Sequence, residues 1–169
     1  MTNIPNKDER YKVYMKTYDS KSKNEIIDIY KKWSSFYEWH IIDMGWSAPK
    51  LISDLLLNNT KLNKESSIID IGCGTGLVGI SLRELNYNGI IDGLDLSIDM
   101  MNYAKMKSIK NKTCYNNFFE RNAHDTKIKS NKYDALTCVG SLNFGHINPS
   151  AYYEFIRIIK KNGYITFST

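Results

Sequence analysis

The chain has 169 residues, of which 42% are hydrophobic and 24% charged, a size and composition suited to one globular domain. No window approaches the roughly 18 consecutive apolar residues of a membrane span, and the charged first twenty residues lack the apolar core of a secretory signal. The formal net charge is +5, and the three cysteines show no CxxC spacing, which argues against a disulfide framework and a zinc site. We therefore expect a protein of a reducing, cytoplasmic compartment, with no membrane partner and no metal.

Part of the positive charge is concentrated between residues 105 and 132, where Lys and Arg outnumber Asp and Glu. A nucleic-acid-binding patch is one interpretation of this segment. No basic run with interleaved aromatic residues supports it, so a solvated lysine surface is the favoured interpretation.

In chain order, the first twenty-odd residues are polar, and we expect no regular structure there. Residues 24–42 have apolar and aromatic side chains at helical spacing, which predicts one helix. A second helix is predicted from Ser47, a suitable N-cap with Pro49 in the first turn, to residues 58–59.

From Ser66 onward, short apolar runs alternate with helical ones, which is typical of a parallel sheet with right-handed crossovers. Runs such as "GIIDGL" and "YDALTCV" fit strands that are buried on both faces. In such a sheet the ligand binds beyond the carboxyl ends of the strands. The predicted strands are 66–71, 89–94, 113–119, 133–139 and 163–168, and the predicted helices are 76–86, 97–108 and 149–161, with a loop over 121–131.

The stretch "SIIDIGCGTGLVG", residues 67–79, places Asp70 in a strand and then four glycines before a helix. Glycines at this point let the backbone approach a ligand and leave N–H groups free to point at it. Residues 74–79 match the dinucleotide pattern GxGxxG, but the strand runs directly into Gly72, from which the pattern is GxGxG. A carboxylate at Asp70 would repel a diphosphate and would suit a cationic ligand without phosphate. Gly79 is then interpreted as a helix-packing residue.

The next predicted strand ends in Asp95, 19 residues after Gly76. A carboxylate at the tip of this strand can accept hydrogen bonds from both hydroxyls of a ribose. The alternative is that Asp95 caps the following helix, although Ser97 is the better cap.

Four stretches between residues 68 and 168 carry a family resemblance: "IIDIGCGTG", "IDGLDLSIDMM", "YDALTCVGSL" and "IIKKNGYITFS". In order and spacing they resemble the motifs of class I S-adenosylmethionine-dependent methyltransferases. The stretches "YKKWSSFYEWHIIDMGWSAP" and "GLVGISLRELNYNGIIDGLDLS" resemble, more narrowly, the methyltransferase-like group named after the Williams–Beuren syndrome region. The resemblance implies an α/β, Rossmann-like doubly wound sheet, S-adenosylmethionine as cofactor and S-adenosylhomocysteine as product.

Carried over residue by residue, the resemblance implies that Asp70 faces the methionine ammonium and that Asp95 holds the ribose hydroxyls. Leu96 and Met100 would flank the adenine, although Met100 could equally be a core residue. The N-terminal helix carries an aromatic stripe at helical spacing, formed by Tyr30, Trp33, Phe36, Tyr37 and Trp39. Tyr37 or Trp33 could border the sulfonium, while packing in the core is the favoured role of the aromatic stripe. The expected cofactor-binding residues are Trp33, Tyr37, Asp70, Gly72, Cys73, Gly74, Gly76, Leu77, Asp95, Leu96, Met100, Asn122, Ala123, His124, Gly140, Ser141 and Leu142.

One position departs from the family pattern. Where the family often has an acid that contacts the adenine amino group, this chain has Asn122. Either the Asn122 oxygen accepts that hydrogen bond without a charge, or the loop is shifted and Asp125 accepts it. We favour the segment 122–124.

Methyl transfer from a sulfonium requires mainly that nucleophile and methyl group be aligned, so the sequence does not fix a catalytic residue. His146 follows the fourth predicted strand and is a candidate general base, but a loop histidine that only lines the pocket is the favoured interpretation. The segment "GSLN" stands where amino-directed nucleic-acid methyltransferases have an Asn-Pro-Pro-Tyr type tetrapeptide. A small-molecule acceptor is therefore expected, and RNA is disfavoured but left open.

The family's sheet has seven strands, whereas five are predicted here, so we expect a fragment or short form that lacks strands 6 and 7. We expect residues 1–65 to form a helical segment covering the cofactor site and residues 66–169 to form the cofactor-binding domain. The favoured function is methyl transfer to a small molecule. The alternatives are a non-catalytic module that binds the cofactor or a partner protein and, less favoured, a nicotinamide oxidoreductase.

Overall fold

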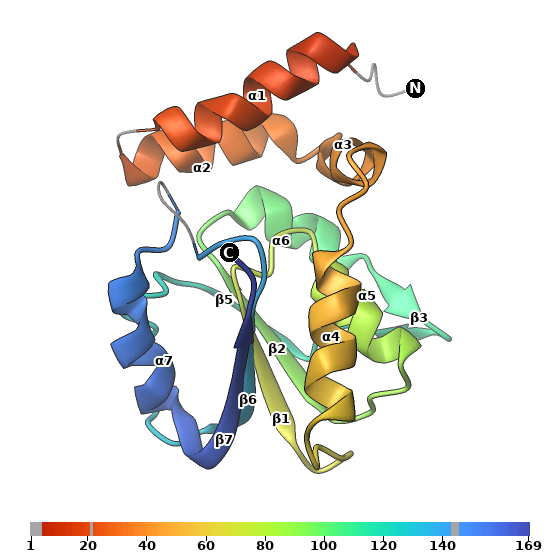
Figure 1. Cartoon of the computed structure of the whole chain (residues 1–169), viewed down its shortest axis with the longest axis vertical. Helices are drawn as coiled ribbons and strands as arrows, with labels where there is room; N and C mark the ends of the chain where they lie inside the picture. Colours follow the sequence, from red (N-terminus) through yellow and green to blue (C-terminus); the bar gives the residue numbers. More distant parts are fainter. Residues whose placement is uncertain (1–4, 21, 143–145) are drawn as a thin grey trace.

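A computed structural model describes residues 5–20, 22–142 and 146–169 of the chain. Its centre is a five-stranded parallel sheet in the order β5-β2-β1-β6-β7 (Figure 1). Strand order reverses at β1, so the switch point lies at the carboxyl ends of β1 and β6. The α/β Rossmann-like fold predicted from the sequence is confirmed. The strands are β1 (Ser67–Ile71), β2 (Ile90–Asp95), β5 (Asn117–Glu120), β6 (Tyr133–Cys138) and β7 (Ile159–Phe167).

Helices cover both faces of the sheet because successive residues of the buried strands point to opposite sides. Ile68 of β1 belongs to a core cluster with residues of α4, α5 and α6, whereas Ile69 and Ile71 belong to one with residues of α7. All three isoleucines are fully buried. The covering helices are α4 (Ala48–Asn58), α5 (Leu77–Glu84), α6 (Ile98–Lys105) and α7 (Tyr152–Ile158), the last preceded by the short 3-10 turn η1 (Pro149–Ala151).

Three further helices, which we call the roof, lie across the carboxyl ends of the strands (Figure 1). They are α1 (Lys7–Asp19), α2 (Lys23–Trp33) and α3 (Tyr37–Asp43). Helix α4, in contrast, packs beside α5 on the sheet rather than over its end. Within the segment 1–65, therefore, the roof is the part that lies over the ends of the strands.

The expectation that the first twenty residues lack regular structure was wrong. Helix α1 starts with a reciprocal capping box between Asn6 and Glu9. Its buried Arg10 donates to the Pro5 carbonyl oxygen and to the carboxylate of Asp43 in α3. The helix is thus fixed by contacts with the rest of the roof, which apolar periodicity cannot reveal.

The single helix predicted over residues 24–42 is two helices, α2 and α3. Ser34 ends α2, and its hydroxyl donates back to the Lys31 carbonyl oxygen at 2.8 Å. Such back-bonding competes with the helical hydrogen bonds and bends helices. Across the break, Tyr37 of α3 packs edge-on against Trp33 at the end of α2.

Two boundaries in the second half also differ from the prediction. The strand expected over 113–119 is divided into β4 (Lys112–Thr113), which pairs with β3 (Ser108–Ile109), and the sheet strand β5. The helix expected to reach residue 161 ends at Ile158, because Lys132 donates its N–H to the Ile158 carbonyl oxygen and Ile159 already pairs with β6. In both cases pairing with a distant segment overrides the local preference.

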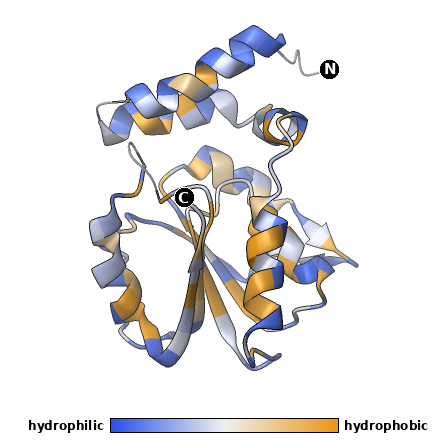
Figure 2. Ribbon diagram, viewed as in Figure 1, coloured by the Kyte–Doolittle hydropathy of each residue, from blue (hydrophilic) through white to orange (hydrophobic). Residues whose placement is uncertain are grey.

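Helix α4, beside the sheet, is largely apolar, whereas α1 is largely hydrophilic along its length (Figure 2). In the part of the chain that the structure describes, no helix combines the length and apolar character that crossing a membrane requires.

An ion pair fixes the loop after β5 to α7, and it predicts acid sensitivity. The Glu154 carboxylate accepts hydrogen bonds from the Arg157 guanidinium, at 2.7 Å, and from the backbone N–H and hydroxyl of Thr126. The hydrogen bonds from Arg157, with those from Thr126, lower the pKa of Glu154 to about 2. This contribution to stability is complete above the unfolded-state pKa of about 4.3 and is lost as the pH falls toward 2.

We expect Glu154→Gln to lower the free energy of unfolding at pH 7 by about 1.5–3 kcal/mol, the value of hydrogen bonds to charged groups. The difference from the parent should shrink as the pH falls from 4.5 to 2.5, since the parent then loses the same contribution. Urea unfolding at a series of pH values measures this. Glu84→Gln, at an exposed position of α5, is the control, and a difference that stays constant with pH would contradict the argument.

Candidate functional site

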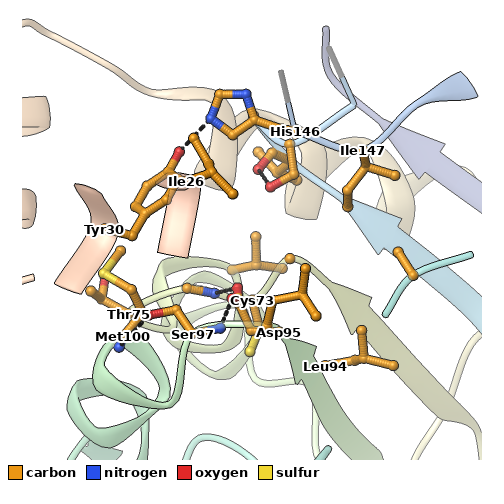
Figure 3. A pocket seen from close by; sticks show the side chains of 18 of the residues that line it. Ile26, Tyr30, Cys73, Thr75, Leu94, Asp95, Ser97, Met100, His146 and Ile147 are labelled. Carbon is orange, nitrogen blue, oxygen red and sulfur yellow. Dashed lines mark hydrogen bonds between the residues drawn. The ribbon is translucent and has the colours of Figure 1, made fainter. Parts of the chain in front are cut away.

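A cavity lies between the roof and the carboxyl ends of β1, β2 and β6, at the switch point of the sheet (Figure 3). The loops after these strands and after β5 form its floor and walls, and residues of α2 and α3 close it from above. Thirteen of the seventeen predicted cofactor-binding residues line it: Tyr37, Gly72, Cys73, Gly74, Leu77, Asp95, Leu96, Met100, Asn122, Ala123, His124, Gly140 and Ser141.

The glycine loop after β1 forms the floor. The Gly72 and Cys73 N–H groups both donate to the Leu94 carbonyl oxygen of β2, at 2.7 and 3.1 Å. Gly72 has a φ of +70°, and a Cβ added there would lie 2.4 Å from the Ser141 hydroxyl oxygen. Only glycine, therefore, lets the loops after β1 and β6 approach this closely.

Asp95 ends β2 and joins the glycine loop to the next helix. One carboxylate oxygen accepts the Gly74 N–H at 2.8 Å, and the other accepts the Ser97 N–H at 2.8 Å. Burial raises the pKa of Asp95, while the backbone hydrogen bonds oppose that rise. The Ser97 side chain caps α6 by accepting from the Met100 N–H, so the helix cap is Ser97, as expected, and Asp95 lines the cavity.

Asp70 does not reach the cavity, contrary to the expectation that it would face a ligand ammonium. It is fully buried, and its two carboxylate oxygens accept hydrogen bonds from the Tyr115 and Thr137 hydroxyls, both at 2.7 Å. Burial raises the pKa of Asp70 to about 7, against the effect of these two donors. Tyr115 also accepts the Gly79 N–H at 3.0 Å, so Asp70 supports the start of α5 from behind the glycine loop.

Three other predicted residues also lie outside the lining. Trp33 is 2% exposed and packs inside the roof, stacked on Tyr30 and edge-on to Tyr37. Gly76 precedes α5 and faces Ala104, whose Cβ an added side chain would meet at 2.9 Å. Leu142 is buried in the core on the α7 side of the sheet.

The segment after β5 lies at one wall of the cavity. Asn122, Ala123 and His124 line it, whereas Asp125 lies outside the lining, exposed and paired with Lys127 at 2.6 Å. The Asn122 side-chain oxygen already accepts the His124 N–H at 2.9 Å. Of the two alternatives, the geometry favours 122–124, with the Asn122 oxygen partly occupied.

The roof contributes lining residues that the sequence did not single out, and one of them meets His146. The Tyr30 hydroxyl lies 2.7 Å from His146 Nε2, across the top of the cavity (Figure 3). Tyr30 stood within the predicted aromatic stripe, but helical spacing alone could not distinguish it from Trp33. The other unpredicted lining residues are Ile26, Ile27, Trp46, Pro49, Thr75, Val78, Leu94, Ser97, Arg121, Val139 and Ile147.

Comparison with known families identifies the domain. Residues 62–169 match the model of a family described as "Methyltransferase domain", which is more than half of the chain. The chain belongs to this methyltransferase family. Its assignment to the class I methyltransferase superfamily is therefore confirmed, with S-adenosylmethionine as the cofactor of that class.

Curated relatives of this methyltransferase domain are distant. A ubiquinone biosynthesis O-methyltransferase of Hydrogenovibrio crunogenus is 26% identical over 106 residues, 63% of this chain and 43% of the relative. Human methyltransferase-like protein 27 is 24% identical over 144 residues, 85% of this chain and 57% of the relative. The chain thus spans less than half the length of the ubiquinone biosynthesis relative and somewhat more than half that of the human protein.

Solved structures resemble the fold. A putative S-adenosylmethionine-dependent methyltransferase of Methanococcus maripaludis has a TM-score of 0.63 at 23% identity, covering 88% of this chain and 66% of its own. A possible histamine N-methyltransferase of Thermotoga maritima has a TM-score of 0.59 at 22% identity, covering 82% and 58%. At these identities the likeness shows the fold of the methyltransferase domain.

The residues of this methyltransferase cavity fit a nucleoside that carries an amino acid. Each Asp95 oxygen makes one backbone hydrogen bond, and a carboxylate oxygen can accept a second, which leaves capacity for ribose hydroxyls. Met100 and Leu96 supply apolar surface beside it. Thr75 is a lining residue, 2% exposed, and its buried hydroxyl has no hydrogen-bond partner within the described residues.

Proposed function

We propose that the chain binds S-adenosylmethionine in this cavity and transfers its methyl group to a small-molecule acceptor. The observation that carries the proposal is the position of Asp95, whose carboxylate is tied to Gly74 and Ser97 at the floor of the cavity. The cofactor would supply an electrophilic methyl group on a sulfonium. The chain would hold the ribose at Asp95, flank the adenine with Leu96 and Met100, and exclude water with the roof.

Support for a small-molecule acceptor comes from the relatives whose printed names place them in ubiquinone biosynthesis. We further infer a narrower relationship to the Williams–Beuren methyltransferase-like group. The match to human methyltransferase-like protein 27, which covers more of this chain than the ubiquinone biosynthesis matches do, supports it.

Two further proposals concern organisation and compartment. We infer that residues 1–65 cover the cofactor through α1–α3 and that residues 66–169 form the binding domain, with α4 packed on its sheet. A cytoplasmic location is supported by the three free, buried cysteines, which a reducing compartment would leave unpaired.

Calorimetric titration with S-adenosylhomocysteine tests the cofactor assignment. We expect saturable binding with a Kd below about 1 mM, equivalent to more than about 4 kcal/mol, and no binding of NADH under the same conditions. Failure of S-adenosylhomocysteine to bind at millimolar concentration would remove the cofactor assignment and the function with it. Binding without methyl release to any of a panel of acceptors would favour the non-catalytic alternative.

A further inference from the structure

The roof and the loop after β6 are joined over the cavity by one side-chain hydrogen bond. It links the Tyr30 hydroxyl to His146 Nε2 at 2.7 Å, and both residues line the cavity (Figure 3). The Tyr30 ring is held by stacking on Trp33, with centroids 5.6 Å apart, and the His146 ring lies edge-on to Tyr18 at 6.2 Å. Packing in the roof thus fixes both partners of this bond.

The surroundings of Tyr30 keep its hydroxyl protonated. Burial raises the pKa of Tyr30 well above its usual value, and the neighbouring Tyr37, Asp95 and Tyr18 raise it further. Tyr30 is therefore a neutral phenol, and with His146 in the tautomer that carries its proton on Nδ1, the Tyr30 hydroxyl donates to the lone pair of Nε2. In this arrangement the Tyr30 oxygen keeps lone pairs of its own, which can accept a hydrogen bond from a molecule in the cavity.

The lining near this pair is apolar. The residues contributed there by α2, by the connection from α3 to α4, by the first turn of α4 and by the loop after β6 include Ile26, Ile27, Trp46, Pro49 and Ile147. Among the described lining residues, Asp95 is the one carboxylate, and both its oxygens already accept backbone hydrogen bonds. In the proposed complex Asp95 is engaged by the ribose hydroxyls, so a protonated amine near Tyr30 would be desolvated without a carboxylate of its own to pair with.

We propose that the acceptor is a neutral, apolar molecule with a hydroxyl group, and that Tyr30 receives the hydroxyl proton while passing its own to His146. This inference rests on the proposed function and names the acceptor class for the same site. The acceptor oxygen forms the new O–C bond as the methyl C–S bond breaks, and sulfur keeps that electron pair as a neutral thioether. The acceptor proton ends on Tyr30, and the proton that Tyr30 held ends on Nε2 of an imidazolium at His146. Tyr30 is the residue that touches the acceptor, and His146 acts through it.

A chromogenic phenol provides a test that does not depend on turnover. 4-Nitrophenol absorbs visible light only as its phenolate, so its spectrum reports its ionisation in the site. With the chain saturated by S-adenosylhomocysteine, we expect the bound probe at pH 6 to be about threefold more ionised than the free probe, because a positioned base takes its proton. Tyr30→Phe and His146→Gln should abolish this difference. Tyr18→Phe, which removes a roof hydroxyl that bonds to Tyr14 instead, should keep it.

A second readout compares matched nucleophiles under turnover. We expect Tyr30→Phe and His146→Gln each to lower kcat for phenol by about 100-fold, the usual scale of general-base catalysis. For thiophenol the change should stay within about threefold, because thiols ionise more readily than phenols and need less help. S-adenosylhomocysteine affinity should remain within twofold of the parent in both variants.

Three results would overturn the inference while leaving the proposed function in place. One is a parent chain that binds S-adenosylhomocysteine but methylates benzylamine and no phenol. Another is a probe spectrum that is the same in the parent and in both variants, and the third is an equal loss for phenol and thiol. Failure of the parent to bind S-adenosylhomocysteine would instead remove the proposed function.

Discussion

Asp95→Ala should raise the Kd for S-adenosylhomocysteine about 10- to 100-fold relative to the parent. The carboxylate lies in the cavity lining with acceptor capacity beyond its two backbone hydrogen bonds. Each hydrogen bond to a charged acceptor contributes about 1.5–3 kcal/mol, and about 1.4 kcal/mol corresponds to tenfold in affinity. Isothermal titration calorimetry at pH 7.5 measures the change.

The same substitution also leaves the Gly74 and Ser97 N–H groups without their acceptor, so loss of loop order must be separated from loss of ribose contact. Asp95→Asn keeps one carbonyl oxygen and should give an intermediate Kd. Asp99→Ala is the matched control, because Asp99 lies close by in the first turn of α6 but outside the cavity lining. Its Kd for S-adenosylhomocysteine should stay within twofold of the parent. An Asp95→Ala protein that unfolds at the parental temperature and binds within twofold of the parent would remove Asp95 from the site.

The parts of the fold that local sequence encodes were predictable. The apolar strands, the glycine loop and Asp95 at the tip of β2 follow from periodicity and from the geometry of strand-to-helix turns. The cavity consequently contains the segments 72–74, 95–96 and 122–124, which the sequence places after β1, β2 and β5. The prediction holds because each of these segments is positioned by the strand just before it.

Residues positioned by partners far along the chain were not predictable in the same way. Asp70 was interpreted as a ligand contact, but Tyr115 and Thr137, 45 and 67 residues away, occupy its oxygens. No local pattern distinguishes a carboxylate that faces a ligand from one that accepts two buried hydroxyls. The same holds for the aromatic stripe, where the break after Trp33 leaves Trp33 inside the roof and brings Tyr37 to the cavity.

Gly79 shows how a distant packing contact also explains a misleading motif. It completes GxGxxG from Gly74, the pattern that suggested a dinucleotide. In the structure it lies in α5 directly beneath Tyr115, where a Cβ would meet the ring carbons at 2.2 to 2.9 Å. Its N–H donates to the Tyr115 hydroxyl, which donates in turn to Asp70. This contact accounts for the glycine without any phosphate, which supports reading the loop as GxGxG.

Gly79→Ala should therefore lower the free energy of unfolding by about 2–4 kcal/mol. Overpacking a filled core costs about 1–3 kcal/mol, and displacing Tyr115 also weakens its buried hydrogen bond to Asp70, worth up to about 3 kcal/mol. The sign is informative, because at an unobstructed helical position the same change would stabilise by up to about 1 kcal/mol through helix propensity. Urea unfolding measures the free energy, and at this chain length 1 kcal/mol corresponds to a shift in Tm of about 2–4 °C.

Two further variants assign the loss to the Tyr115 ring. Ser81→Ala, on the same helix, removes only a buried hydroxyl that bonds back to the Leu77 carbonyl oxygen, so its effect should stay below about 1.5 kcal/mol, the net value of one hydrogen bond. Tyr115→Leu is destabilising by itself, but it leaves room for a methyl group at position 79, so the double variant with Gly79→Ala should be no less stable than Tyr115→Leu alone. Strict additivity of the two losses would show that the ring is not what Gly79 accommodates, and the phosphate-binding interpretation of the motif would then have to be reopened.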